Sequence, residues 1–196
     1  MGKVVVSQFA SLDGVIEDPG GAEDYRHGGW AFKFDRGDDG DKFKLDEVMA
    51  ADALLLGRTT FEGFAAAWPS REGEFADKFN TMPKYVVSDT LTDPEWNNST
   101  VIRGDDVAAE VARIRDAHDG DVLVNGSAQL VQALARGDLV DEYRLMVFPV
   151  ALGEGKRMFA EDGEPVRLRL AGTQPVGPDG VIVLTYEPAR DASDGD

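Results

Sequence analysis

The sequence contains no cysteine and only two histidines, His27 and His118. Without cysteine the chain can form no disulfide, no thiolate metal site and no cysteine nucleophile. The two histidines do not form an H-x-x-x-H pair, so we expect no histidine-rich zinc site and predict no metal. No apolar run is long enough to span a bilayer, and no hydrophobic leader follows Met1. These absences favour a cytoplasmic protein.

Positive charge is scarce as well. The chain has 37 acidic and 20 basic residues and a formal net charge of −17 at pH 7. Such a surface would repel a phosphate backbone or an anionic membrane, so we expect neither nucleic acid nor membrane as a partner. The acidic surface fits a protein from a high-salt cytoplasm, and it fits an ordinary protein with a solvated acidic surface equally well.

Several common catalytic and nucleotide-binding motifs are missing. The chain has no G-x-S-x-G sequence, and neither histidine lies where a catalytic triad can be argued. No G-x-G-x-x-G follows a predicted strand, which argues against an ordinary Rossmann site. The segment at 153–156 lacks the spacing and the following Ser or Thr of a P-loop, so we interpret it as a turn. A bound nucleotide would need another kind of phosphate site.

The stretch at 53–63 predicts a site of that other kind. Four apolar residues at 53–56 predict a short buried strand that ends at Gly57. A helix then begins with Arg58, Thr59 and Thr60, and its first-turn N–H groups, its dipole and the guanidinium of Arg58 would attract an anion. One face of the helix is apolar, with Phe61, Phe64, Ala65 and Trp68. In the alternative reading Thr59 or Thr60 only caps the helix and Arg58 points to solvent.

The same strand, small-residue turn and helix start recur at Asn125-Gly126-Ser127. Residues 121–125 predict a strand, Ser127 is expected to cap the following helix, and Gly137 is expected to end it. Two helix N-termini at the ends of buried strands suit a dinucleotide with separated phosphates. Neither turn carries a standard nucleotide fingerprint, so the two readings of the first turn stay open at this point.

Strands and helices alternate through most of the chain and then give way to strands alone. The patterns predict helices at 43–51 and 74–80 and from Asp105, and strands at 3–9, 84–88 and 100–103. Strands at 139–152, 166–170 and 181–187 follow, the last two joined by a turn at 178–180, so an antiparallel edge is expected. The predicted fold class is therefore α/β, a three-layer domain with flanking helices. We expect residues 1–188 to form one domain and residues 189–196 a flexible acidic tail.

A long segment without clear periodicity separates the first predicted strand and helix. Residues 17–41 are rich in Gly and Asp and contain isolated aromatic rings, among them Trp30. Loops of this length inside a compact domain are usually functional or mobile. The rings either pack on a flat ligand or pin the loop to the core, and the sequence allows both.

Six segments stand in the order found in the dihydrofolate reductase superfamily. They are Ser11-Leu12-Asp13-Gly14, 56–60, 83–88, Asn125-Gly126-Ser127, 139–142 and 148–156. Over residues 3–187 the chain resembles most closely the branch that contains the reductase domain of riboflavin biosynthesis, the RibD C-terminal domain. The resemblance implies a mixed sheet of about eight strands with an antiparallel C-terminal edge and with NADPH across the strand ends. It leaves the formation of a homodimer open.

The resemblance also implies where the cofactor would bind. Phe9, Ala10, Gly14 and Ile16 would flank the nicotinamide. The adenosine-side phosphate would lie on Gly57, Arg58, Thr59 and Thr60, with Arg58 on the 2′-phosphate and Ser88 beside the adenine ribose. The pyrophosphate would be bound by the segment from Gly126 to Leu130, through Gly126, Ser127, Gln129 and Leu130, and Asn125 would also contact the cofactor. Trp30 and Phe61 would be substrate contacts.

No catalytic residue can be assigned in the same way. Dihydrofolate reductases hold the pteridine with a carboxylate on the helix before the G-R-x-T strand, and Asp41 and Asp46 are the candidates here. Asp13 is a third candidate carboxylate. In a chain so rich in Asp, each of these residues can equally be a solvated or capping side chain.

The chain also departs from the riboflavin enzymes at two polar positions. Val15 stands where their S-L-D-G-K segment has lysine, and Asn125-Gly126-Ser127 stands where they usually have E-G-G. The expected function is a reductase that transfers hydride from NADPH to a small flat heterocycle, resembling 5-amino-6-(5-phosphoribosylamino)uracil reductase and dihydrofolate reductase. The alternative is a non-catalytic module on the same scaffold that binds a nucleotide or another flat ligand.

Overall fold

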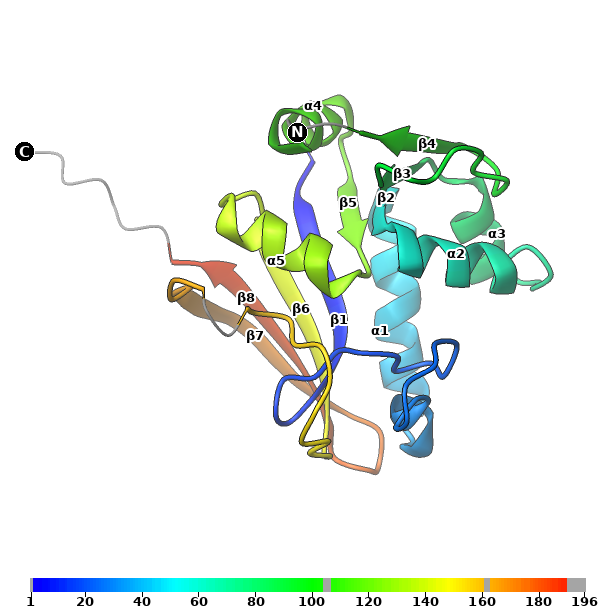
Figure 1. The fold of residues 1–196 in the computed structure, drawn as a ribbon. Coiled ribbons are helices and arrows are strands. Elements are labelled where there is room, and N and C mark those ends of the chain that lie inside the picture. Colours follow the sequence, from blue (N-terminus) through cyan, green and yellow to red (C-terminus); the bar gives the residue numbers. More distant parts are fainter. Residues whose placement is uncertain (1, 104–106, 161–162, 190–196) are drawn as a thin grey trace, which may run out of the picture.

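The protein is built on one eight-stranded sheet (Figure 1), seen in a computed structural model that describes residues 2–103, 107–160 and 163–189. The strand order is β4-β3-β2-β5-β1-β6-β8-β7. The strands are β1 (Val4–Ser11), β2 (Ala51–Gly57), β3 (Lys84–Val87), β4 (Ser99–Ile102), β5 (Asp121–Val124), β6 (Glu142–Phe148), β7 (Leu168–Val176) and β8 (Val181–Pro188). The helices are α1 (Gly37–Ala50), α2 (Arg58–Ala67), α3 (Glu74–Thr81), α4 (Val107–Ala117) and α5 (Ala128–Arg136), with a short 3₁₀ helix at Trp30–Lys33.

The sheet is parallel from β4 to β6 and antiparallel at its C-terminal edge. β1 pairs in parallel with β5 and β6, and β2 pairs in parallel with β3 and β5. β8 then pairs antiparallel with both β6 and β7. The predicted mixed sheet with an antiparallel C-terminal edge is confirmed.

Helices cover both faces of the parallel part, which makes the three predicted layers. Val4 and Val6 of β1 pack with α4 and α5, whereas Val5 packs on the opposite face with α1, α2 and α3. β2 alternates in the same way, because Leu55 joins the first cluster and Leu54 and Leu56 the second. Because both faces of these strands are covered, their sequences are continuous apolar runs and do not alternate between apolar and polar residues. Figure 1 shows α5 in front of the sheet and α1 behind it.

Some predicted bounds are wrong. The strand expected at 139–152 is shorter, Glu142–Phe148, and the one expected to begin at Val166 begins at Leu168. The helix expected from Phe43 begins at Gly37, because its first two turns are rich in Gly and Asp and give no apolar periodicity. The helix start expected at Asp105-Asp106 and most of the expected tail, 190–196, lie outside the described residues. The division into one domain and a tail stays a prediction.

The long loop between β1 and α1 is fastened to the core by its aromatic rings. Trp30 is 1% exposed, and its Nε1 donates a hydrogen bond to the carbonyl oxygen of Glu17 at 2.8 Å. Its ring meets that of Phe148 edge-on, with 5.6 Å between the centroids. The expectation that Trp30 contacts the substrate is therefore corrected, because the ring pins the loop to the core instead.

Asp13 joins the loop after β1 to the loop after β6. Its carboxylate accepts hydrogen bonds from Ser11 Oγ at 2.6 Å and from the backbone N–H groups of Leu152 at 3.0 Å and Gly153 at 2.8 Å. The Ser11 hydroxyl is the largest cause, and the two N–H groups add to it, so that the pKa of Asp13 falls from 3.8 to about 2. Asp13 thus holds the two loops together, and the prediction that it is a catalytic carboxylate is corrected.

The low pKa of Asp13 makes stability depend on pH. Between about pH 4 and pH 2 the unfolded chain binds a proton that the folded chain does not, so this contribution is present above the unfolded pKa and is lost on acidification. Asp13→Asn should lower the free energy of unfolding by about 1–2 kcal/mol at pH 7 and by less at pH 3. Urea unfolding at both pH values measures this. Asp46→Asn, on an exposed surface pair, is the control; equal losses for Asp13→Asn at the two pH values would contradict the prediction.

Candidate functional site

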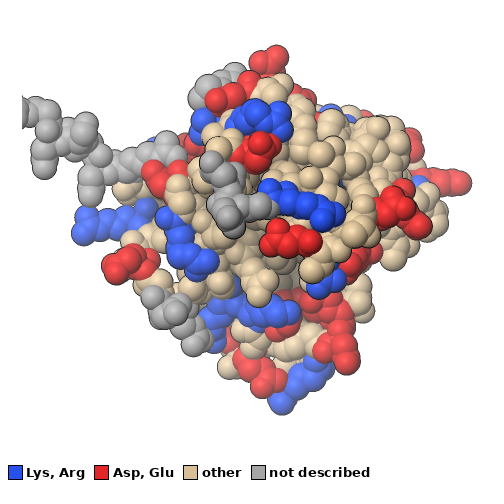
Figure 2. All heavy atoms as spheres, turned by 45° about the horizontal axis from the view of Figure 1, so that its top comes forward, with Lys and Arg blue, Asp and Glu red and all other residues tan. Residues whose placement is uncertain are grey.

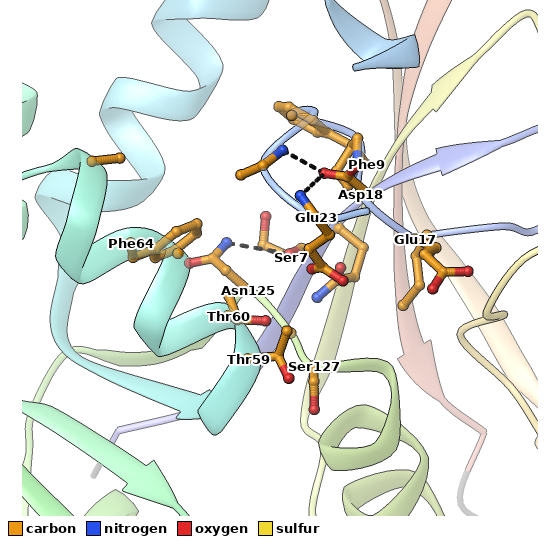
Figure 3. Close-up of a pocket in the computed structure, with 18 of the residues that line it drawn as sticks. Ser7, Phe9, Glu17, Asp18, Glu23, Thr59, Thr60, Phe64, Asn125 and Ser127 are labelled. Carbon is orange, nitrogen blue, oxygen red and sulfur yellow. Dashed lines mark hydrogen bonds between the residues drawn. The ribbon is translucent and has the colours of Figure 1, made fainter. Parts of the chain in front are cut away.

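A cavity of about 640 Å³ lies at the carboxyl ends of the central parallel strands (Figure 3). Ser7, Gln8 and Phe9 of β1 form part of its floor. The turns after β2 and β5, one face of α2, part of α1 and the loop at 16–23 form its walls. This is the position where open parallel sheets bind ligands, because loops and helix N-termini converge there.

The two anion-site turns predicted from the sequence meet at one edge of this cavity. β2 and β5 are neighbours in the sheet, and the N–H of Gly57 donates to the carbonyl oxygen of Gly126 at 3.0 Å. A Cβ on Gly57 would overlap Ser127 Oγ and lie 2.9 Å from Ser127 Cβ. Gly126 has φ of 124°, and a Cβ there would lie 2.7 Å from Thr60 Oγ1. Glycine is needed at both positions for the turns to pack together.

Neither of these helix N-termini is capped by a side chain. Gly57 occupies the N-cap of α2 and Ser127 that of α5, and neither position shows a side-chain capping hydrogen bond. The prediction that Ser127 caps its helix through its hydroxyl is therefore wrong. The alternative in which Thr59 or Thr60 only caps α2 is not what the structure shows, because the helix has no side-chain cap. Both threonines line the cavity instead.

Eight of the fourteen predicted cofactor contacts line the cavity. They are Phe9, Ile16, Thr59, Thr60, Asn125, Gly126, Ser127 and Gln129. Figure 3 shows Thr59 and Ser127 side by side at the edge where α2 and α5 begin.

The remaining predicted cofactor residues lie behind or beside the cavity. Ala10 and Leu130 are 5% exposed members of the core, and Gly14 forms a turn with φ of 81°. Ser88 Oγ accepts the backbone N–H groups of Thr90 and Leu91, which closes a turn after β3. Arg58 has a side chain 48% exposed and pairs with Glu62 at 3.1 Å, one turn further along α2.

The other predicted substrate and catalytic residues are corrected by the structure. Phe61 is 2% exposed and packs against Trp96 at a centroid distance of 5.9 Å, so it belongs to the core. Asp41 and Asp46 are exposed on α1 and pair with Arg36 and Lys42. Neither carboxylate lines the cavity.

Lys44 and Glu47 form a charged pair at the cavity floor that the sequence did not lead us to predict. Lys44 lines the cavity, and Glu47, one turn later on α1, is buried beneath it. Ser7 Oγ donates to Glu47 Oε2 at 2.8 Å and accepts from Lys44 Nζ at 2.7 Å. The available signal was spacing, because Gly40, Lys44, Glu47 and Val48 share one helix face; the many other acidic residues nearby obscured it.

An aromatic corner closes the end of the cavity beside α2. Trp68 and Phe75 stack at 5.0 Å, and Phe64 and Phe79 flank them. All four rings line the cavity. The guanidinium of Arg71 lies 4.4 Å from the centroid of the Trp68 ring. A corner of this kind suits a flat apolar ligand with a polar edge.

Within the described ranges, no three His, Asp or Glu side chains gather in a way that could hold a metal ion. In the same part of the chain, every helix is too short or too polar to cross a membrane.

Comparisons with known proteins agree on the fold. The family model described as the RibD C-terminal domain matches residues 2–182. Two uncharacterized proteins of Bacillus subtilis (strain 168) are each 28% identical: YyaP over 94% of both chains, and YwjB over 89% of this chain and 92% of its own.

Three solved structures share the architecture at lower identity. A putative riboflavin biosynthesis protein from Shewanella sp. PV-4 superposes with a TM-score of 0.75 at 21% identity, covering 96% of this chain and 99% of that one. RibD of Acinetobacter baumannii gives 0.69 at 17%, covering 97% of this chain and 59% of RibD. Dihydrofolate reductase from Enterococcus faecalis, complexed with NADP(H), gives 0.62 at 18%, covering 96% and 97%. The chain therefore shares its architecture with these three proteins, a dihydrofolate reductase among them.

Proposed function

The chain belongs to the RibD C-terminal domain family, and on this basis we propose that it is a reductase that uses NADPH to reduce a small flat heterocycle. One observation carries the proposal. Two helix N-termini without side-chain caps meet through Gly57 and Gly126 at the edge of a cavity that ends in an aromatic corner. A phosphate-bearing cofactor and a flat acceptor can lie end to end in such a cavity.

The residues at this edge fit the phosphates of a dinucleotide. Thr59, Thr60 and Ser127 bring hydroxyl donors, and Gln129 brings an amide, all lining the cavity. The backbone N–H groups of the first turns of α2 and α5 add donors and the positive ends of two helix dipoles. The carboxylates that line the cavity come from the loop at 17–23 and not from this edge.

Asn125 provides a second point of fit, further into the cavity. Its Nδ2 donates to the carbonyl oxygen of Ser7 at 3.2 Å, whereas its buried Oδ1 has no hydrogen-bond partner among the described residues. A buried acceptor without a donor costs about 1–3 kcal/mol, so a ligand N–H at this position would be favourable. The carboxamide of a nicotinamide ring carries such an N–H.

NADPH, once bound, supplies a hydride, and the protein needs to orient the two ligands and exclude water. Phe9 and Ile16 would flank the nicotinamide, and the corner of Phe64, Trp68 and Phe75 would hold the acceptor flat. Val15 is fully buried and brings no polar group to the cavity. We therefore expect slow or absent turnover of the ribosylamino-pyrimidine phosphate of riboflavin biosynthesis.

Two measurements test the function. NADPH fluorescence should change on titration with the protein, and a panel of oxidised heterocycles should include at least one that consumes the bound cofactor. Absence of NADPH binding would refute the proposal. Binding without turnover of any acceptor would favour a non-catalytic module on the same scaffold.

Arg58 should distinguish NADPH from NADH. We propose that its guanidinium leaves Glu62 to bind the 2′-phosphate, for which NADH has only a hydroxyl. Arg58→Ala should weaken NADPH about tenfold or more and leave NADH nearly unchanged. Glu62→Gln, which removes the competing carboxylate, should strengthen NADPH binding. Paired titrations, with circular dichroism as the folding control, measure these effects; equal losses for both cofactors would show that Arg58 does not contact the phosphate.

A further inference from the structure

The buried face of α1 carries a charged pair where an ordinary core helix carries apolar residues. The Lys44 side chain is 12% exposed and that of Glu47 1%. Removing two charges from water costs several kcal/mol, and an apolar pair of similar size usually stabilises a fold at least as well. Stability alone therefore does not account for this pair.

Lys44 is held in place by two hydrogen bonds, which leave one N–H group of its ammonium without an acceptor among the described residues. Its Nζ donates to Ser7 Oγ and to Glu47 Oε2, and Ser7 donates to the same Glu47 oxygen. The other oxygen of Glu47 lies 3.8 Å from the guanidinium of Arg144, so the carboxylate is itself anchored. An ammonium group has three hydrogens, and the described residues provide acceptors for two. The third has no acceptor among the described residues; Nζ also lies 5.5 Å from the centroid of the Phe9 ring, which lines the same cavity as Lys44.

The charges that line the cavity are distributed unevenly. The three acidic side chains, Glu17, Asp18 and Glu23, all come from one loop, where Lys156 pairs with Glu17 and Glu23. The lining contributed by α1, its N-cap and the segment after α2 carries Arg36, Lys44 and Arg71 and no carboxylate among its described residues. Over the face in Figure 2, acidic and basic side chains are interspersed. Arg36 of this basic lining also pairs with Asp41, which does not line the cavity. A lining that carries cations and no carboxylate of its own is thus a local feature of a chain with net charge −17.

The basic lining adjoins the aromatic corner. Phe75 lines the same shallow surface hollow as Lys44 and Arg36, and Arg71 lies over Trp68. The outer part of that hollow also carries the carboxylates of Asp41, Glu72 and Glu74. A ring stacked in this corner would have its edge within the field of these cations. A desolvated ammonium group favours an acceptor atom, and more strongly an anionic one.

We propose that Lys44 determines substrate specificity, and that the acceptor ring carries a negatively charged oxygen substituent that accepts a hydrogen bond from Lys44 Nζ. This inference rests on the proposed function in so far as the cavity holds the hydride acceptor. A carboxylate in this place would select ring amino groups, whereas Lys44 selects against them. Glu47 and Ser7 are positioning residues that hold the ammonium group.

Three probes of nearly equal shape test this inference. 2-Naphthoate, 2-naphthamide and 2-naphthamidine share a ring and a planar substituent and differ in charge. Calorimetric titration of the wild type should give about tenfold or greater preference for the naphthoate over the naphthamidine. Lys44→Met should abolish that preference. Lys42→Met removes the same charge from an exposed position two residues away and should leave the preference intact.

Several results would overturn the proposal. They are a wild type that prefers the naphthamidine, a folded Lys44→Met that keeps the preference, and equal losses in both variants. If Lys44→Met does not fold, amide and side-chain NMR shifts of the wild type decide, because naphthoate must perturb Ser7, Phe64 and Trp68. Shifts confined to other regions would also overturn it. NADPH titrations run in parallel keep this outcome separate from that of the reductase proposal.

Discussion

Gly57→Ala should weaken nucleotide binding by about tenfold or more and lower the free energy of unfolding by about 1–3 kcal/mol. The backbone of Gly57, with φ of −78° and ψ of 158°, is open to any residue, so strain in the chain is not the cause. The cause is space, because the new methyl group would overlap Ser127 Oγ and lie 2.9 Å from its Cβ and 3.0 Å from its N. Either β2 or the start of α5 must move, and the two anion-binding turns would separate.

A graded set of second substitutions tests this steric reasoning. Ser127→Ala removes only the overlapping hydroxyl, whereas Ser127→Gly removes Cβ as well. The free energy of unfolding should therefore recover partly in Gly57→Ala/Ser127→Ala and further in Gly57→Ala/Ser127→Gly. Nucleotide affinity should recover less, because both double variants also lack the Ser127 hydroxyl at the phosphate edge. Glycine at an N-cap costs only a few tenths of a kcal/mol, so it should not mask the recovery.

Gly63→Ala is the matched control on the same segment. A Cβ at this helical position meets nothing within 4 Å, and alanine should stabilise α2 by up to about 1 kcal/mol. Thermal melts and NADPH titrations of all four variants provide the measurements. A Gly57→Ala protein as stable and as tightly binding as the wild type would show that the two turns are not sterically coupled.

Lys84→Met should lower the free energy of unfolding by about 3 kcal/mol. Lys84 is fully buried, and its Nζ donates to the carbonyl oxygens of Asn80 at 2.9 Å, Met82 at 2.8 Å and Asn97 at 3.0 Å. It also lies 4.4 Å from the centroid of the Trp96 ring. One ammonium group thereby joins the end of α3 to the segment before β4. Methionine fills similar volume and leaves three carbonyl groups without their donor.

The pH dependence of Lys84 gives a second readout. Burial lowers the pKa of Lys84 from 10.5 to about 8. Between these values the unfolded chain holds a proton that the folded chain has released, so this group makes the free energy of unfolding rise with pH through that window. Lys84→Met should lack that rise.

Denaturant unfolding at pH 7.5 and pH 9.5 measures both effects, and Lys33→Met, at an exposed position, is the control for loss of positive charge. A cost for Lys84→Met no larger than that of Lys33→Met would mean that the three carbonyl groups find other donors, and the clamp would not be needed.

The strands were the most predictable part of the fold. Val4, Val5 and Val6 lie between two helical layers, so the run of β-branched residues specifies a central strand without further context. The start of α1 at Gly37 was not predictable, because its first turns contain Gly and Asp and are set by contacts rather than by propensity. Gly177 N–H, in the turn before β8, donates to Asp39 Oδ1 at 3.0 Å, a contact between distant parts of the chain.

For the candidate site, residue types were predictable and exposure was not. Trp30 and Phe61 have the chemistry of ligand contacts, yet Phe148 and Trp96 bury them. Lys44 was overlooked for the opposite reason, since the spacing that places it on one helix face with Glu47 and Val48 is obscured by the many acidic residues nearby. Burial depends on what packs against a side chain, and that partner is usually distant in sequence.

The sequence alone determined the α/β class, the absence of cysteine chemistry and two strand–turn–helix segments suited to anions, because each follows from residue type and local spacing. Only the tertiary structure decided that these two segments act together. β2 and β5 become neighbours through parallel pairing, and this brings Gly57 against Gly126 and Ser127. Parallel pairing of β5 with β1 in the same sheet accompanies the contact of Ser7 with Lys44 and Glu47 of α1. Parallel pairing joins residues far apart in the chain, and no local pattern encodes which strands will be neighbours.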